Sequence, residues 1–377
     1  MKKAVCATRG DAVGRGSGRI LAAALVAVTL GPLGVSARPL DDVLDRWDTR
    51  TARFLLGQIP DDQLDPRVLS VQGYVSFLDG DYAAAEMDLE RATSNRDAAR
   101  LLPIVRASRV LATTLQRRES PSGRIVVSFR AFPDEALVPY LFEAGDAAID
   151  ALSLRLGIAP RGPIRIEVAP TLEDLARVTG LPESEVRASG TVAVCKYNRI
   201  VLVSPSAFPG GYPYADTLGH ELVHFLLTLE GGDRLPLWFQ EATAKYLEST
   251  WRGASPGALT RGQRMLLTGA SAQGRLIPFS SLRDSLARLP RVEDTALAFA
   301  ELSSFAAFLE RTVGDGTLAR LAAALPTADE DTAVARVTGR PLASLVETWE
   351  KTLAVEGISD GSPAGTQPGQ EMRGDKG

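Results

Sequence analysis

Histidine and cysteine are scarce in this chain of 377 residues, which contains two of each. Cys6 lies in an N-terminal segment that we expect to be removed, and Cys195 then has no partner for an internal disulfide. The folded protein must therefore be held together by its apolar core, where we expect Cys195 to be a small buried side chain. The hydrophobic fraction of 45% is ordinary for a globular protein, and a chain of this length predicts two ordered domains with tails.

Basic residues are not in excess either, with 42 Lys and Arg against 46 Asp and Glu and a net charge of −4. Residues 1–37 carry five basic side chains and one acidic one, so the rest of the chain has a net charge of −8. An acidic chain without a clustered basic face argues against nucleic acid as a partner.

The apolar stretch of residues 20–30 is too short to span a bilayer comfortably. It follows a basic segment and precedes the small residues Val35, Ser36 and Ala37. This order predicts a signal peptide over residues 1–37, cleaved after Ala37, and a periplasmic or extracellular protein with no membrane contact after cleavage. A retained N-terminal anchor is the alternative.

The only two histidines, His220 and His224, are four residues apart, and Glu221 directly follows the first. On an α-helix this step returns to nearly the same face, so both imidazoles can reach one metal ion. Glu221 lies about 100° further round the helix, where it could deprotonate a water without being a ligand itself. This H-E-x-x-H pattern is typical of zinc peptidase helices, and a chance match on a soluble helix is the alternative.

Glu241 lies on a second predicted helix, over residues 236–248, which follows a Gly231-Gly232 turn. A helix, a glycine turn and a helix form a hairpin, which brings Glu241 back toward the two histidines. Two histidines and one glutamate leave a fourth position open, which is the catalytic form of a zinc site. The sequence therefore predicts one Zn²⁺ per chain, held by His220, His224 and Glu241.

The two helices resemble the gluzincin branch of zinc metallopeptidases, and more narrowly the bacterial peptidase-MA-like domains. These pair H-E-x-x-H with P-x-W-x-x-E-G-x-A-x-Y, which stands here as Pro236, Trp238, Glu241, Ala244 and Tyr246. Ala242 replaces the usual glycine. The resemblance covers residues 124–355 and implies an α+β, zincin-like domain with a mixed sheet, an active-site helix and a helical lower subdomain. It also implies hydrolysis of a peptide or protein substrate, with Glu221 as general base.

Two further roles at the site stay open in the sequence. The oxyanion formed during hydrolysis needs a hydrogen-bond donor, for which the candidates are Tyr212, Tyr214 and Tyr246. In the related domains we expect a tyrosine near the start of the helix over residues 298–308, where this chain has Phe299.

A metal-bound imidazole usually donates its other N–H to a carboxylate or carbonyl. Asp216, four residues before His220, and Glu248, seven after Glu241, are the candidates. The better-known enzymes of the family place an acid four residues after the ligand glutamate, where this chain has Lys245. A surface ion pair between Lys245 and Glu248 is the alternative role for Glu248.

Residues 38–118 are predicted to be helical, and residues 65–93 resemble a single tetratricopeptide-like hairpin. A protein partner at this region would follow by analogy, and an ordinary helical hairpin packed against the catalytic domain is the alternative. A linker is predicted at residues 119–123 and a disordered tail at residues 356–377. Residues 190–195 are the candidate edge strand that would bind a peptide by adding it to the sheet.

Two functions from different classes follow. The first is an exported zinc endopeptidase or aminopeptidase. The second is a catalytically inactive zincin-like protein that serves as a binding or scaffold module with structural zinc, which Phe299 and the helical N-terminal region favour.

Overall fold

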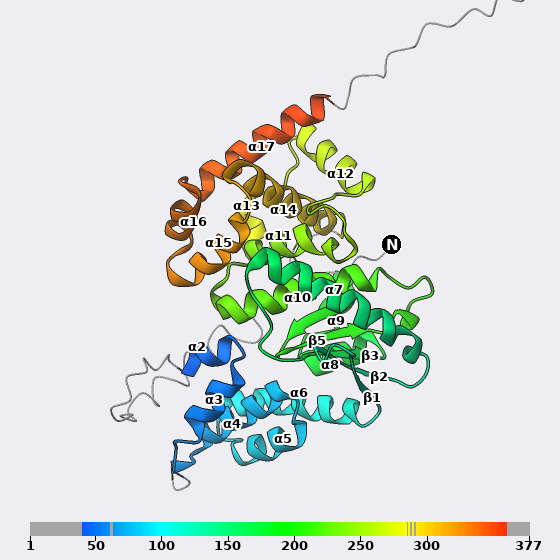
Figure 1. Cartoon of the computed structure of the whole chain (residues 1–377), viewed down its shortest axis with the longest axis vertical. Helices are drawn as coiled ribbons and strands as arrows, with labels where there is room; N and C mark the ends of the chain where they lie inside the picture. Colours follow the sequence, from blue (N-terminus) through cyan, green and yellow to red (C-terminus); the bar gives the residue numbers. More distant parts are fainter. Residues whose placement is uncertain (1–39, 61–62, 285, 287–288, 290–291, 360–377) are drawn as a thin grey trace, which may run out of the picture.

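A mixed five-stranded sheet lies in the middle of the computed structural model, with helices at both ends (Figure 1). The structure describes residues 40–60, 63–284, 286, 289 and 292–359, so the predicted signal peptide at 1–37 and its cleavage site lie outside the described residues. The coarse α+β prediction is confirmed. Within the described part of the chain, no helix is long and apolar enough to cross a membrane.

The N-terminal region is helical, as predicted. Its helices are α2 (Leu40–Asp45), α3 (Thr49–Leu56), α4 (Pro66–Asp79), α5 (Tyr82–Arg91) and α6 (Arg96–Ala112). Asp65 caps α4 and Asp81 caps α5, and between them Gly80 has a φ of 82°, which a glycine adopts without strain. The α4–α5 hairpin lies at the position predicted from residues 65–93.

The predicted end of this helical region at residue 118 is wrong. Residues Gln116–Glu119 form strand β1, which pairs antiparallel with β2 (Ile125–Phe129). All four residues of β1 are polar and exposed, so the sequence has no alternation of apolar and polar residues there that would predict a strand. The predicted linker is the turn of this hairpin, where the Ser120 N–H donates to the Ile125 carbonyl over 2.8 Å. The helical region therefore runs directly into the sheet.

The strand order in the sheet is β1-β2-β3-β5-β4, with β3 at Ile164–Ala169, β4 at Ala193–Lys196 and β5 at Arg199–Val203. Strands β2, β3 and β5 are parallel, whereas β4 pairs antiparallel with β5 and forms the edge. Tyr197 and Asn198, both with a φ of 56°, make the two-residue turn between β4 and β5. The prediction that residues 190–195 include an edge strand is confirmed by β4.

Helices cover both faces of the sheet. Ile200 and Leu202 face α10 (Tyr214–Gly231) and α7 (Val138–Leu156), whereas Val201 and Val203 face α8 (Leu172–Thr179) and α9 (Glu183–Ser189). Asp134, which precedes α7, does not cap this helix; its carboxylate accepts hydrogen bonds from Ser204 and Arg130 instead.

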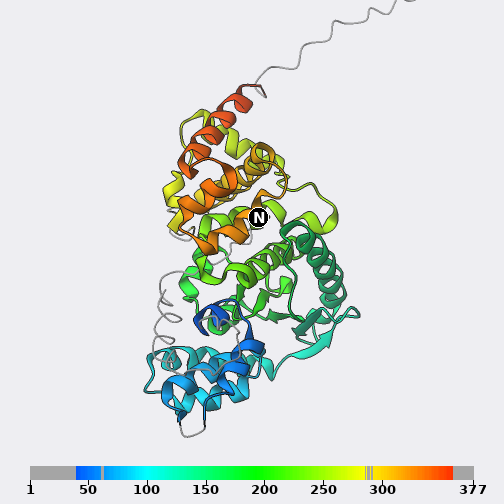
Figure 2. The ribbon, with the colours of Figure 1, turned by 60° about the vertical axis from the view of Figure 1, so that its left-hand side comes forward.

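The helices that follow α10 in the chain lie in the upper part of the molecule (Figures 1 and 2). They are α11 (Leu237–Leu247), α12 (Arg261–Ala272), α13 (Phe279–Asp284), α14 (Val292–Val313), α15 (Thr317–Ala324), α16 (Glu330–Thr338) and α17 (Leu342–Ser359). Trp238, Phe279, Phe305 and Trp349 join four of these helices through ring contacts. The predicted disordered tail begins too early, since residues 356–359 belong to α17, and its remainder lies outside the described residues.

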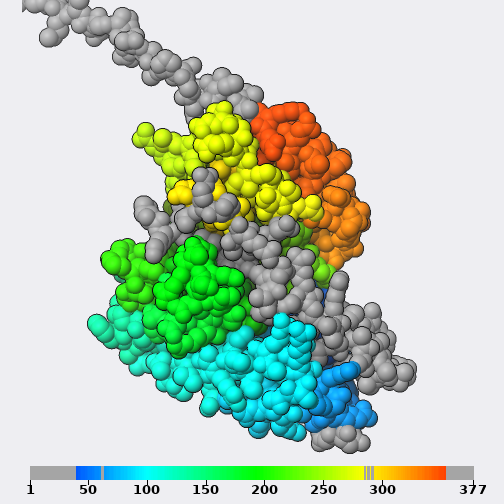
Figure 3. Space-filling model, turned by 180° about the vertical axis from the view of Figure 1, so that it is seen from behind, coloured from blue at the N-terminus to red at the C-terminus, as the bar shows by residue number. Residues whose placement is uncertain are grey.

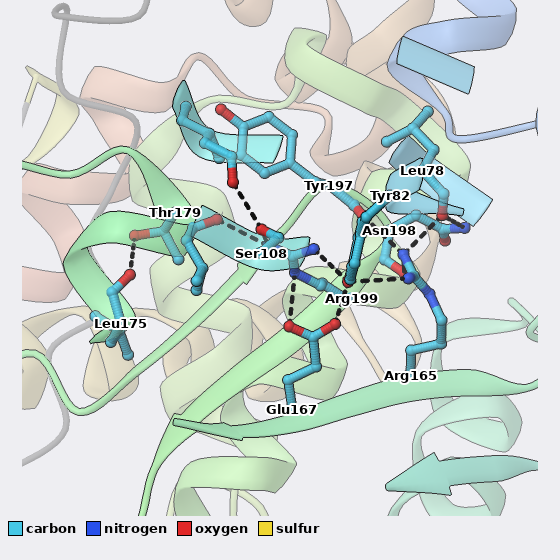
Figure 4. Close-up of polar contacts among 12 residues, drawn as sticks. Leu78, Tyr82, Ser108, Arg165, Glu167, Leu175, Thr179, Tyr197, Asn198 and Arg199 are labelled. Atoms are coloured by element: carbon cyan, nitrogen blue, oxygen red, sulfur yellow. Dashed lines mark hydrogen bonds and ion pairs between the residues drawn. The ribbon is translucent and has the colours of Figure 1, made fainter. Parts of the chain in front are cut away.

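A buried polar network joins the N-terminal helices to the sheet (Figure 4). Arg199 of β5 is fully buried and donates to the Tyr82 hydroxyl over 2.6 Å and to the Ser108 hydroxyl over 2.9 Å. Its Nε lies 3.4 Å from the carboxylate of Glu167, which also accepts a hydrogen bond from Tyr82. Elsewhere in this region, Trp47 packs against Phe225 of α10 with ring centroids 5.4 Å apart. The helical region is thus packed against the body of the protein, and in Figure 3 its blue and cyan surface adjoins the green surface of the rest of the chain.

Candidate metal site

Helix α10 places both histidines in the interior. His220 is 1% and His224 6% exposed, because apolar residues occupy the other faces of the helix, which packs between the sheet and α11. One turn separates the two rings, and their Nε2 atoms lie 3.2 Å apart. Both imidazoles therefore point to the same place.

Helix α11 returns beside α10 after the short turn Gly232–Arg234 and brings Glu241 to this place. One carboxylate oxygen lies 3.5 Å from the Nε2 of His220 and the other 3.7 Å from the Nε2 of His224. Both oxygens are buried and accept no hydrogen bond. The three side chains predicted as ligands converge and could hold a metal ion.

The charges of the site call for a cation. Burial and the Lys245 ammonium disfavour a charged ring, but Glu241 and Glu248 outweigh them and raise the pKa of His220 to about 9. Burial also disfavours a charged Glu241, yet His224 and His220 lower the pKa of that carboxyl to about 2. Without a metal ion, a proton on His220 therefore supplies the positive charge next to Glu241.

Glu221 lies beside this group and is fully buried. Burial raises the pKa of its carboxyl, and Glu241 adds to this effect, whereas His220 and His224 oppose it. The main-chain N–H of Cys195 on edge strand β4 donates to the same carboxyl. Glu221 thus lies between the two histidines of its own helix and the edge of the sheet, and it is not one of the three side chains that converge.

Glu248 makes the contact predicted for either Glu248 or Asp216. Its Oε2 lies 3.2 Å from the Nδ1 of His220, the ring nitrogen that faces away from Glu241, and it also accepts from Lys245 over 2.6 Å. Asp216 instead accepts hydrogen bonds from Trp251 and Arg252, at 2.8 and 3.0 Å. It forms no hydrogen bond with His220. Glu248 therefore contacts His220 and also pairs with Lys245, but this pair is not at the surface as the alternative had it, because the two side chains are only 21% and 8% exposed.

Gly219 permits this contact, and sequence reasoning missed it. A Cβ added to Gly219 would lie 2.3 Å from the Glu248 carbonyl oxygen, so only a glycine lets the end of α11 approach α10 this closely. A glycine inside a buried helix costs about 1 kcal/mol relative to alanine, and that cost was the signal of a packing role.

The three candidate tyrosines have different surroundings. The Tyr212 hydroxyl donates to the Val203 carbonyl over 2.5 Å, and burial together with the charge of Glu221 raises its pKa. Tyr214 is half-buried near Tyr140, and burial raises its pKa. The ring of Tyr246 lies against Gly257, and its hydroxyl is influenced by Glu310 rather than by the site.

Phe299, which stands where we expected a tyrosine, contacts the site directly. Its ring is edge-on to that of His220, with centroids 6.3 Å apart, and the Lys245 ammonium lies 4.7 Å from the centre of the same ring. The position is therefore next to His220, but it offers no hydroxyl.

No protein-family model matches the chain, and a search among curated proteins finds no significant match.

Proposed function

We propose that the protein is an exported zinc-dependent peptidase with a zincin-like catalytic domain. The observation that carries the proposal is the convergence of His220, His224 and Glu241 at buried positions, with Glu221 beside them. Two histidines and one glutamate are the ligand set of catalytic zinc in several peptidases, in which a fourth position stays open.

The spacing of the ligand atoms supports zinc. Ligand atoms about 2.0–2.1 Å from a tetrahedral zinc ion are about 3.3 Å apart. The separations of 3.2, 3.5 and 3.7 Å among the three side chains are close to this value. The buried Glu241 oxygens, which accept no hydrogen bond, would be satisfied by the ion.

Zinc, when bound, would polarise the scissile carbonyl and increase the acidity of the attacking water. Glu221 is the residue that would accept the proton of this water and pass it to the leaving amine. Its buried position supports that role, because desolvation raises the pKa of the carboxyl toward the value that a base working near neutral pH needs.

Edge strand β4 would hold the substrate. The Val203 N–H donates to the Val192 carbonyl, and hydrogen-bonded pairs alternate along an antiparallel ladder. The main-chain groups of Ala193 and Cys195 therefore face away from β5. The Cys195 N–H already donates to Glu221, so a peptide added as a further strand would pair with the main-chain groups of Ala193 and with the Cys195 carbonyl, along the edge next to Glu221.

Phe299 favours the second function, a metal-binding module without catalysis, because the side chain beside His220 cannot donate a hydrogen bond to an oxyanion. Among the three tyrosines, Tyr212 is the one whose pKa responds to the charge of Glu221. For the catalytic function, Tyr212 would have to release the Val203 carbonyl and donate to the oxyanion instead.

The test measures zinc content and peptide cleavage on the purified full chain and on Glu221→Gln. We expect one zinc ion per chain in both proteins, since Glu221 is not a ligand. Cleavage of a mixed peptide library by the variant should fall by a factor of about 10²–10⁴, the usual contribution of a positioned base.

Glu347→Gln is the matched control, because Glu347 is 67% exposed and lies on α17, outside the site. It should leave both zinc content and cleavage unchanged. If each protein binds one zinc ion per chain but none cleaves a peptide, the result would contradict the peptidase function and support the metal-binding module. A chain that takes up no zinc would contradict both.

A further inference from the structure

Lys245 occupies an unusual place for a lysine behind the candidate metal site. Its side chain is 8% exposed and donates to the Oε2 of Glu248 over 2.6 Å, while the ammonium lies over the ring of Phe299. The same Glu248 oxygen lies 3.2 Å from the Nδ1 of His220. Lys245 and His220 thus share one oxygen of Glu248. The ring of Phe299, over which the ammonium lies, also contacts the His220 ring.

A second pair in the chain shows what a surface ion pair would look like. Lys351 and Glu347 are also 2.6 Å apart, but their side chains are 73% and 67% exposed. Such an exposed pair contributes little, because solvent screens the charges. Lys245 and Glu248 are 8% and 21% exposed, so their charges act on His220 with less screening.

We propose that Lys245 is a positioning residue of the metal site that acts through Glu248 on His220; this inference rests on the proposed zinc function. Lys245 neutralises the carboxylate that orients the imidazole, so that a metal ion on the other side of the ring meets a nearly neutral pair. Glu248 alone would add a full negative charge next to the ligand, and Lys245 alone would add a full positive charge.

This charge balance predicts opposite effects of two single substitutions on zinc affinity. Lys245→Met keeps the apolar stem over Phe299 but exposes His220 to the unneutralised Glu248, so zinc should bind about tenfold more tightly. Glu248→Gln leaves Lys245 unneutralised and weakens the orienting hydrogen bond, so zinc should bind about 10–100-fold more weakly. The double variant, without either charge, should return to within about fivefold of the unchanged protein.

The experiment measures the zinc dissociation constant of the full chain by competition with a chromophoric chelator, at one pH and ionic strength. Thermal unfolding of the metal-free proteins shows whether each variant folds. Lys351→Met and Glu347→Gln, singly and together, are the matched controls and should leave the dissociation constant unchanged. Lys245→Arg, which keeps the charge, should stay close to the unchanged protein.

A purely structural role gives a different pattern, in which both single substitutions weaken zinc binding and the double substitution weakens it further. That pattern, or no change in Lys245→Met, would overturn the role of Lys245 while zinc uptake and cleavage by the unchanged protein still support the peptidase. If the unchanged protein binds no zinc, the proposed function itself is wrong and this inference is wrong with it.

Discussion

Replacing Arg199 by methionine should destabilise the protein far more than the loss of a surface arginine. Arg199 is fully buried and donates to Tyr82, Ser108 and the Val178 carbonyl, at 2.6, 2.9 and 2.8 Å. Its guanidinium is also the cation next to Glu167, which is 7% exposed. Removing one partner of a buried ion pair costs about 3–5 kcal/mol, because the other charge stays buried without compensation.

The source of this cost can be separated with a second substitution. In Arg199→Met/Glu167→Gln the buried charge is gone, while the Tyr82 hydroxyl can still donate to the amide oxygen of residue 167. We therefore expect the double variant to recover at least half of the stability lost in Arg199→Met.

Urea denaturation of the metal-free proteins, followed by tryptophan fluorescence and circular dichroism, measures the effect. A loss of about 3–5 kcal/mol corresponds to a fall of roughly 1–2 M in the urea midpoint for a protein of this size. Arg124→Met is the matched control, since Arg124 is 36% exposed and pairs with Asp146 at 3.0 Å. Its loss should cost less than about 1 kcal/mol. Equal midpoints for Arg199→Met and Arg124→Met, or a double variant no more stable than Arg199→Met, would refute the reasoning.

Three further predictions concern other buried groups. Burial, with a contribution from Glu350, raises the pKa of the Glu301 carboxyl to about 8, although the Ile277 N–H opposes this. The folded state therefore binds more protons than the unfolded state between about pH 4.5 and 8, and stability should fall as pH rises through that window. Glu301→Gln should remove the Glu301 contribution to this decline and be more stable at pH 8 by on the order of 3 kcal/mol, but not at pH 4, as urea midpoints at the two pH values will show. Gly219→Ala should push the end of α11 away from α10 and weaken zinc binding at least tenfold, measured by chelator competition. Glu241→Gln should lower the zinc content below one ion per chain and remove most of the increase in thermal midpoint that zinc gives the unchanged protein.

The elements predicted well are those whose signals are local. Thr171 caps α8 by accepting from the Asp174 N–H, and a threonine directly before an amphipathic segment is a typical start of a helix. The turn between β4 and β5 could be placed from the residues that separate two apolar runs. Strand β1 could not be predicted, because its exposed residues are held by main-chain bonds to β2 and carry no apolar pattern.

Polar alternation in β3 was the clearest case in which the sequence was insufficient. Arg165 and Glu167 alternate with apolar residues, a pattern that is typical of a strand with one face in solvent. That face is instead covered by the N-terminal helices, where Arg165 donates to the Leu78 carbonyl over 2.7 Å and Glu167 contacts Arg199 and Tyr82. Period-two patterns identify the two faces of a strand, but the element that covers a polar face comes from a distant part of the chain.

The candidate site divides in the same way. The spacing of His220 and His224 is a property of one helix. The position of Glu241 next to them could be predicted from the helical hairpin alone. The choice between Asp216 and Glu248 as partner of His220 depended on how closely two helices approach each other. Gly219 sets that distance through its missing Cβ, and no helical periodicity describes it.

These contacts also extend the structural unit beyond residues 124–355, the range of the family resemblance. Strand β1 precedes that range and pairs with β2. Trp47 packs against Phe225, the residue after His224, and Tyr82 and Ser108 satisfy the buried Arg199. A chain without residues 40–112 would leave Arg199 and Glu167 on the sheet without these partners and would uncover Phe225 of α10, next to His224. The helix that carries both imidazoles is therefore packed in part against the N-terminal region.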